Sequence, residues 1–412
     1  MTAPLRVHLK RGRSKPFWVG HPWVFSGAID KVDGEVGELG GECVVLDERG
    51  NVLGSGSYNP QGAIAVRIWE HRRTTDREFE PQPFSELLAA RVELAVTRRQ
   101  ILGFPSEDTD SYRLVNGEGD GLSGLVVDVF GDVVVAQLGS RGIYERREEV
   151  YDLLSSQLNP RAVVTVTTED TSRLEAIPVE REVVRGALDG PVEIEEGGAR
   201  FQVDPVSGQK TGFYLDQRES RRAFGRISRD RSVLDLFSYT GAFGIRAAMD
   251  GATSVTAVDS SRPALDRAQA NADLNGVGDR WTPWTGDAMS YLKAARAEGR
   301  KWDRIVCDPP KFAKGRSHLD DAIKKYARLN TLALGALSPG GMLLTCSCSQ
   351  HVSEKDFLRM LTDAGHRLRR GVQVHGLWGQ PADHPHLAVA PEGRYLKVAL
   401  VGLDRPLIES GA

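Results

Sequence analysis

The sequence predicts an α/β protein with a doubly wound parallel sheet behind two smaller N-terminal parts. Short strands and turns fill the first 70 residues, a helix and a hairpin follow, and strands alternate with helices from about residue 200. Such alternation predicts a parallel sheet with helices on both faces. We therefore expect three domains, at residues 1–72, 73–195 and 196–412.

The first 72 residues favour a small β-barrel or sandwich. Strands fit Glu42–Asp47 and Ala63–Trp69, with Gly, Asn and Pro at the turns. Trp18, Trp23 and Phe25 accompany basic residues in an acid-free segment, 1–29. Basic and aromatic side chains together suit phosphate contacts and base stacking, whereas the alternative is a charged arm with buried aromatic residues. The basic candidates for RNA binding are Arg6, Lys10, Arg11, Arg13 and Lys15.

The middle part, 73–195, predicts a linker, an amphipathic helix from Phe84 and a small α+β module. Apolar residues recur at three- and four-residue spacing after Phe84. A hairpin turns at Gly131-Asp132, and a helix near 143–157 precedes a strand at Ala162–Val166. None of these residues carries recognisable chemistry, so we expect the module to position its neighbours.

The C-terminal part supplies the alternating pattern. A helix fits Arg262–Asn275, with Gly276 as its end. Strands fit Val233–Phe237, Val255–Asp259, Trp281–Thr285, Arg304–Cys307, Gly341–Cys346, Gly371–Leu377 and Arg394–Val401.

Composition and charge limit the classes of function. The chain is 40% hydrophobic and 26% charged, as globular proteins are. We expect a cytoplasmic protein without a membrane partner, because no apolar run reaches the roughly 18 residues of a span and the N-terminus has no apolar signal region. Four cysteines make no disulfide framework. The net charge of −3 disfavours a nucleic-acid coat protein but allows an enzyme with a local basic patch.

A candidate cofactor site follows the first strand of this domain. Ligands of open α/β sheets bind beyond the carboxyl ends of the strands. Gly241 allows close backbone approach there, and the helix after it offers free N–H groups to a carboxylate. The segment lacks the G-x-G-x-x-G fingerprint, which disfavours a nicotinamide enzyme. The candidate contacts in this turn are Phe237, Ser238, Tyr239, Thr240 and Gly241.

Acidic residues follow the next strands in turn. Asp259 ends the second strand, where a carboxylate can accept both hydroxyls of a ribose. Asp287 follows the third strand, where it could face an adenine amino group. Any single acid at such a position is usually a helix cap. Acids at successive strand ends, together with the glycine turn, predict S-adenosylmethionine as the cofactor, and we include Asp308 and Pro309 among its contacts.

The candidate catalytic residues are Asp308 and Cys348. Two prolines after Asp308 make a stiff loop that would hold its carboxyl and the Pro309 carbonyl beside a reacting base. Cys348 falls just past a strand, where a thiolate is a candidate nucleophile. Thiolate addition to carbon 6 of cytosine makes carbon 5 nucleophilic, and an acid at nitrogen 3 stabilises the developing charge. A zinc site at Cys346, Cys348 and His351 lacks a fourth ligand, so we expect no metal.

Several segments in the observed order resemble one known family, the PUA-domain class I methyltransferases that make 5-methylcytosine in large-subunit ribosomal RNA. The resemblance implies a Rossmann-like methyltransferase domain, a PUA-like RNA-binding barrel, S-adenosylmethionine as cofactor and ribosomal RNA as partner. A homodimer is compatible with the sequence, which leaves the oligomeric state open. The matching segments are Lys210–Arg218, Phe237–Gly241, Asp308–Phe312, Ser347–Ser349, Ala382–Pro385 and Pro391–Lys397.

The resemblance also implies roles for individual residues. It makes Cys348, rather than Cys346, the nucleophile, because the Ser-Cys-Ser pattern centres on it. It makes Tyr214 and Gln217 candidate cofactor contacts in the segment that covers the cofactor. Cys346 is a departure from the family pattern, because it adds a second thiol two residues before Cys348. On a strand, both thiols would point to the same face.

Two alternatives stay open. The Asp-Pro-Pro loop followed by an aromatic residue, Phe312, is typical of enzymes that methylate exocyclic amines, which allows an RNA amino-methyltransferase acting on guanine or adenine. A non-catalytic RNA-binding assembly factor is the other.

A second basic cluster also has two interpretations, because Arg218, Arg222 and Arg226 share a helix face that either follows RNA phosphates or is simply solvated.

Overall fold

The computed structural model describes residues 4–37, 40–73, 78–208, 211–312, 315 and 318–406. Lys210, the first residue of one matching segment, lies outside these ranges. The chain forms two compact units, whereas the division into three domains stays a prediction. The first unit comprises Met1–Ile194, Val203–Leu215 and Ala382–Gly393, and the second comprises Glu195–Gln202, Asp216–Pro381 and Arg394–Ala412.

A six-stranded sheet forms the N-terminal part of the first unit. Its strand order is β2-β6-β5-β4-β1-β3, and only β1 and β4 pair in parallel. In β1, Leu5, Val7 and Leu9 are buried and alternate with more exposed residues, as one covered face requires. The elements are β1 (Leu5–Leu9), α1 (Lys15–Trp18), β2 (Trp23–Phe25), β3 (Ile29–Asp33), β4 (Gly41–Leu46), β5 (Val52–Tyr58) and β6 (Ile64–His71).

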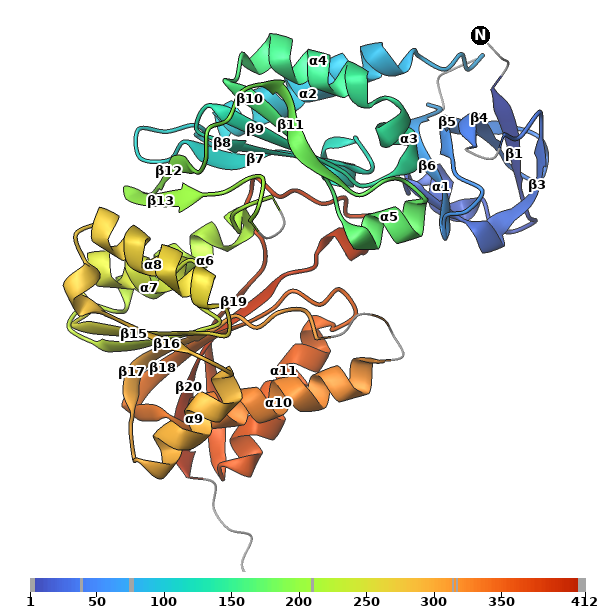
Figure 1. Ribbon diagram of the computed structural model, residues 1–412. Helices are drawn as coiled ribbons and strands as arrows, with labels where there is room; N and C mark the ends of the chain where they lie inside the picture. Colours follow the sequence, from blue (N-terminus) through green and yellow to red (C-terminus); the bar gives the residue numbers. More distant parts are fainter. Residues whose placement is uncertain are drawn as a thin grey trace, which may run out of the picture. The chain divides into compact units, whose positions relative to one another are not determined.

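A five-stranded sheet forms the middle of the chain, in the order β11-β10-β9-β8-β7. The β8–β9 hairpin turns at Gly131 and Asp132 as predicted, whereas the helix expected near 143–157 is two helices. Helices α2 and α4 cover one face of the sheet (Figure 1). The elements are α2 (Phe84–Ile101), β7 (Ser111–Asn116), β8 (Leu125–Phe130), β9 (Val133–Leu138), α3 (Arg141–Glu145), α4 (Arg147–Leu158), β10 (Ala162–Thr167), α5 (Glu169–Glu175) and β11 (Glu180–Gly186).

The six-stranded sheet and the middle module are joined by packing and ion pairs, because Trp69 of the sheet packs into the core of the module. The ring of Trp69, in β6, lies 4.5 Å from the ring of Phe84, in α2. Arg67 donates a 2.8 Å hydrogen bond to the carboxylate of Glu175 and forms a longer ion pair with Glu118. Because these ion pairs are largely buried, removing one partner would leave the other as an uncompensated charge in a low dielectric.

The segment Ala382–Gly393 belongs to the first unit, although the chain on both sides of it belongs to the second. Arg99 is buried and donates to both carboxylate oxygens of Asp120, at 2.8 and 2.6 Å. The same guanidinium donates to the carbonyl of Asp383 at 2.9 Å, and the Asp383 carboxylate accepts the Arg113 N–H at 3.1 Å. The Ala382–Pro385 segment of the family resemblance is therefore part of a buried polar network.

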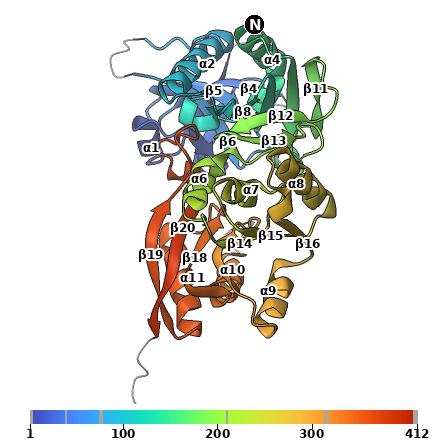
Figure 2. The same cartoon turned by 90° about the vertical axis from the view of Figure 1, so that its left-hand side faces the viewer.

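A seven-stranded sheet forms the second unit, in the order β16-β15-β14-β17-β18-β20-β19. The first five strands are parallel, and β20 runs antiparallel to β18 and β19. Figure 2 shows β16 and β19 at opposite edges of this sheet. The strands are β14 (Ser232–Leu236), β15 (Ser254–Asp259), β16 (Trp281–Thr285), β17 (Trp302–Cys307), β18 (Leu337–Ser347), β19 (Arg370–Trp378) and β20 (Lys397–Pro406). A separate two-stranded sheet pairs β12 (Val192–Glu196) with β13 (Ala199–Val203).

Helices lie on both faces of the seven-stranded sheet, which confirms the predicted fold class. Helices α6, α7 and α8 lie on one face, and α9, α10 and α11 on the other (Figure 1). Side-chain caps begin three of these helices: Ser261 for α8, Asp287 for α9 and Ser353 for α11. The helices are α6 (Arg218–Arg226), α7 (Ala242–Met249), α8 (Arg262–Leu274), α9 (Ala288–Ala297), α10 (Leu319–Gly335) and α11 (Glu354–Arg367).

The central strands of this sheet are buried on both sides. Ile305, Val306, Cys307, Leu343 and Leu344 have no exposed surface, as the inner strands of a doubly covered parallel sheet require. Within the described part of the chain, no helix is long and apolar enough to cross a membrane.

Candidate active site

The strand order reverses between β14 and β17, the two strands at the centre of the second unit. From β14 the chain continues to β15 and β16 on one side, and later to β17 and β18 on the other. The helices that follow β14 and β17 therefore cover opposite faces, and the ligand crevice of an open α/β sheet lies at such a point, beyond the carboxyl ends of the strands. Leu236 pairs with Cys307 in this register, so the turn after β14 begins beside Asp308.

The turn after β14 has an unusual backbone. Phe237, Tyr239 and Gly241 all have positive φ, at 62°, 48° and 85°. Such conformations are strained for residues with side chains and persist only where their surroundings hold them. The Ser238 N–H donates to the Val258 carbonyl at 3.1 Å, and the Gly241 N–H donates to the Ser238 carbonyl at 2.8 Å. Thus the predicted cofactor turn is rigid.

Glycine is required at position 241. A Cβ there would lie 2.8 Å from the ring of Trp281 and 3.1 Å from the Cβ of Ala268. Gly241 also precedes the first residue of α7, whose initial N–H groups lack partners within the helix. The Gly244 N–H of this first turn donates to Asp235 instead, and the side chain of Ser238 is itself buried.

The carboxylate of Asp259, at the end of β15, is held from two sides. One oxygen accepts the Tyr239 N–H at 2.9 Å and the other accepts the Ser261 N–H at 2.8 Å. Each carboxylate oxygen has two lone pairs, so both can still accept from a vicinal diol. Asp259 is half-buried. Its two accepting oxygens fit the two hydroxyls of the ribose of S-adenosylmethionine.

Asp287 is exposed and caps α9. One of its carboxylate oxygens accepts the Ser290 N–H at 2.8 Å and the Ser290 hydroxyl at 2.9 Å. This is the ordinary role of an acid at a strand end, and contact between Asp287 and an adenine stays a prediction.

Asp308 and Gln217 meet, although they are 91 residues apart in the sequence. The Gln217 amide donates to an Asp308 carboxylate oxygen at 2.9 Å. The carbonyl oxygen of the Gln217 amide is buried and accepts no hydrogen bond from the described residues. Tyr214 belongs to the first unit and Gln217 to the second, so a shared role in covering the cofactor stays a prediction.

A third carboxyl lies beneath these two. Asp235 is buried in β14 and accepts the Gly244 N–H at 2.9 Å. Burial raises the pKa of Asp235 to about 8, and the charges of Asp308 and Asp259 act in the same direction. Asp235 is therefore largely neutral at pH 7.

Burial separates the two neighbouring thiols. Cys346 lies inside β18 with no exposed surface, whereas Cys348 follows the end of the strand and is half-buried. Burial raises the pKa of Cys346 well above its ordinary value, and Asp308 adds to this effect. Cys43 and Cys307 are also buried. Cys348 is the accessible thiol among the four.

The loops after β17 and β18 are connected by Tyr326, in α10. The Tyr326 hydroxyl lies 3.0 Å from the Ser349 hydroxyl, and its ring lies 4.6 Å from the ring of Phe312. The ammonium group of Lys397, the first residue of β20, donates to the Ser349 carbonyl at 2.6 Å. The sequence offered no local signal for Tyr326. Lys397 is the last residue of the matching segment Pro391–Lys397, and the resemblance assigned it no role.

Two arginines of α6, one of them from the second basic cluster, are not on the surface. Arg218 and Arg221, in α6, are buried beside Glu196, and Arg221 donates to both of its carboxylate oxygens at 2.6 and 2.7 Å. The expectation of one RNA-facing surface through Arg218, Arg222 and Arg226 is therefore wrong for Arg218. Arg222 and Arg226 are exposed.

The N-terminal basic residues are all exposed, and aromatic residues accompany them. Trp18 is 61% exposed and Phe25 is 47% exposed, whereas Phe17 is buried. The alternative of wholly buried aromatic residues is therefore wrong for Trp18 and Phe25. The exposed basic residues are Arg6, Lys10, Arg11, Arg13 and Lys15.

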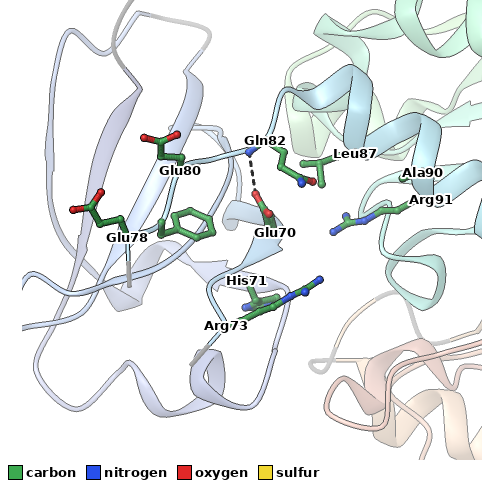
Figure 3. Close-up of a pocket in the computed structure, with 10 residues that line it drawn as sticks. Glu70, His71, Arg73, Glu78, Glu80, Gln82, Leu87, Ala90 and Arg91 are labelled. Carbon is green, nitrogen blue, oxygen red and sulfur yellow. Dashed lines mark hydrogen bonds between the residues drawn. The ribbon is translucent and has the colours of Figure 1, made fainter. Parts of the chain in front are cut away.

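A cavity of about 620 Å³ lies in the first unit, between the end of β6 and the start of α2 (Figure 3). Its lining combines acidic side chains, such as Glu70 and Glu78, with Arg73 and Arg91. Burial lowers the pKa of His71, which also lines it, to about 4. This mixture of charges selects no class of ligand, and the residues predicted for catalysis belong to the other unit.

The fold and the crevice define a class I, S-adenosylmethionine-dependent methyltransferase. A family model described as "S-adenosylmethionine-dependent methyltransferase" matches residues 181–376, and a PUA-like domain model matches residues 7–71. These matches confirm S-adenosylmethionine as the cofactor. They also confirm the PUA-like character of the N-terminal sheet.

Similar proteins identify the family. The chain is 37% identical to "Ribosomal RNA large subunit methyltransferase I" of Shewanella denitrificans, over 95% of this chain and 98% of that protein. It is 38% identical to the protein of the same name from Klebsiella pneumoniae, over 95% and 96%. The chain therefore belongs to the ribosomal RNA large subunit methyltransferase I family.

Solved structures share the fold across nearly the whole chain. A protein described as "a putative sam-dependent methyltransferase from Streptococcus mutans" has a TM-score of 0.81 at 21% identity, covering 96% of this chain and 99% of that one. A "putative methyltransferase complexed with SAH" has a TM-score of 0.82 at 20% identity, with the same coverage.

Replacement of Asp259 tests the cofactor site. Asp259→Asn keeps an oxygen for the Tyr239 N–H but removes the charge and one acceptor, so we expect S-adenosylmethionine to bind about tenfold more weakly or worse. Titration calorimetry measures this change. Asp266→Asn, on the exposed side of α8, is the matched control and leaves affinity unchanged. Equal affinities for the two variants would contradict the assignment.

Proposed function

We propose that this chain methylates carbon 5 of a cytosine in large-subunit ribosomal RNA, with Cys348 as a covalent nucleophile. The observation that carries the proposal is the half-buried Cys348 directly after β18, the strand that pairs with β17, which Asp308 directly follows. The names of the relatives at 37% and 38% identity support ribosomal RNA as the substrate. Such a substrate is consistent with the cytoplasmic location expected from the sequence.

Each group in the site has a defined task in this reaction. The Cys348 thiolate forms a bond to carbon 6 of the cytosine, and the Asp308 carboxyl stabilises the charge that develops at nitrogen 3. Carbon 5 then carries the electron density needed to accept a methyl group. Bound S-adenosylmethionine supplies that methyl group as an electrophile on a sulfonium. A base then removes the carbon 5 proton, and the electrons of the broken C–H bond restore the ring double bond and expel the thiolate.

Gln217 and the turn after β14 prepare this site. The Gln217 amide orients the Asp308 carboxylate through its 2.9 Å hydrogen bond. The half-buried Asp259 and the rigid turn from Phe237 to Gly241 hold the cofactor, with the remaining predicted contacts at Tyr214, Asp287 and Pro309. The target base has to leave any stacked or paired structure to reach Asp308.

The exposed basic and aromatic residues of the PUA-like domain contribute the RNA-binding surface of this proposal. Arginine and lysine side chains neutralise phosphates, and an exposed indole such as that of Trp18 stacks on unpaired bases. This local surface reconciles RNA binding with a chain whose net charge is −3.

Serine in place of Cys348 tests the mechanism. Cys348→Ser replaces the thiolate with a poorly nucleophilic hydroxyl, so we expect methyl transfer to ribosomal RNA to fall by at least about a thousand-fold. Binding of S-adenosylmethionine stays within about twofold, because the cofactor contacts lie elsewhere. Transfer of labelled methyl groups to unmodified RNA measures the first effect, and calorimetry the second.

Cys346→Ala is the matched control and retains methyl transfer. An RNA amino-methyltransferase would tolerate Cys348→Ser, and its product would be a methylated guanine or adenine. An assembly factor without activity would transfer no label in the wild type. Either result would contradict the proposal.

Substitutions in the PUA-like domain test the RNA surface. Trp18→Ala loses one stacking platform, so we expect RNA affinity to fall by roughly 5- to 100-fold. Arg11→Ala combined with Arg13→Ala lowers affinity and reduces its dependence on salt. Fluorescence anisotropy with labelled RNA at several salt concentrations measures both. Arg173→Ala removes an exposed arginine of α5 and is the matched control, and an effect as large as that of Trp18→Ala would contradict the proposal.

A further inference from the structure

Lys397 is a buried cation next to the proposed nucleophile. It pairs with Ser347 across β18 and β20, and only 5% of its surface is exposed. Its ammonium group donates to the Ser349 carbonyl at 2.6 Å and to the Tyr395 carbonyl at 2.7 Å. Ser349 directly follows Cys348, so Lys397 contacts the backbone of the loop that carries the thiol.

Neither contact supplies a negative charge. Both acceptors are neutral carbonyl groups, and among the described residues no carboxylate forms an ion pair with Lys397. A buried ammonium group without a counter-ion is costly, so proteins usually pair such groups or leave them neutral. One anion beside Lys397 would therefore balance its charge.

The surrounding charges identify that anion. Burial lowers the pKa of Lys397 to about 8, and a negative charge on Cys348 acts in the opposite direction. Arg394 and Lys311 are the neighbouring cations, and both oppose a charged Lys397. Arg394 is itself paired with Glu354, at 2.8 Å. Tyr326, on the α10 side, has a pKa that burial raises, so it stays neutral.

We propose that Lys397 is a positioning residue that holds Cys348 as a thiolate. The Cys348 thiol loses its proton to water, which breaks the S–H bond, and the resulting thiolate pairs with the Lys397 ammonium group. The hydrogen bond from Lys397 to the Ser349 carbonyl keeps this pair in place. A catalytic use for the thiolate rests on the function proposed above, whereas the deprotonation of Cys348 does not.

The rate at which iodoacetamide alkylates Cys348, followed against pH by peptide mass spectrometry, tests this inference on the intact protein. The other three cysteines are buried, and Cys348→Ser gives the background. We expect the wild-type rate to reach half its maximum below the pH of about 8.5 that is typical of free cysteine. Lys397→Met removes the cation, so the midpoint of the pH profile rises by about one pH unit. Alkylation at pH 7 then becomes roughly tenfold slower.

Lys324→Met, at an exposed position of α10, is the matched control and leaves the midpoint unchanged. Retained binding of S-adenosylmethionine shows that Lys397→Met is folded. A wild-type midpoint at or above 8.5 would overturn the inference, and so would an unchanged midpoint in folded Lys397→Met. If that variant does not fold, the wild-type midpoint decides alone.

The outcome is separable from that of the proposed function. A low midpoint that depends on Lys397, in a protein that forms no 5-methylcytosine, would refute the function and keep the inference. Formation of 5-methylcytosine by a protein whose Cys348 has an ordinary midpoint would support the function and refute the inference.

Discussion

The parallel pairing of β14 with β17 is the constraint on which the site depends. It places Leu236 beside Cys307, so two chain segments about 70 residues apart end at the same point of the sheet. One segment continues into the strained turn at Phe237, and the other into the stiff loop at Asp308. The pairing of β17 with β18 then brings the end of a third strand, and with it Cys348, to the same edge. Hydrophobic burial of these strands thus offsets the free-energy cost of a rigid, polar crevice at their ends.

Differences in burial give similar side chains different chemistry. Asp235 is buried and largely neutral at pH 7, whereas Asp259 and Asp308 are half-buried and face the crevice. The same contrast separates Cys346, inside β18, from Cys348, just beyond its end. In each case the buried group favours its neutral form, because the interior of the sheet solvates charge poorly.

Local patterns in the sequence predicted most of the fold, because strands, helix caps and turns depend on neighbouring residues. The strand Trp281–Thr285 has the predicted bounds, and α8 begins at Arg262, where Ser261 caps it. Contacts between distant residues could not be predicted in this way. Arg218 had the spacing of a surface arginine, but Glu196 holds it in the interior. The buried position of Lys397 likewise arises only when β20 pairs with β18.

The most direct test of the account is a covalent trap. RNA that carries 5-fluorocytidine at the target would accept the thiolate at carbon 6 and the methyl group at carbon 5, but fluorine cannot leave as a proton does, so the adduct persists. We predict a stable RNA–protein complex that forms only with S-adenosylmethionine, and fragment masses that assign the link to Cys348. Absence of an adduct from RNA that the enzyme otherwise methylates, or a link to Cys346, would contradict the account.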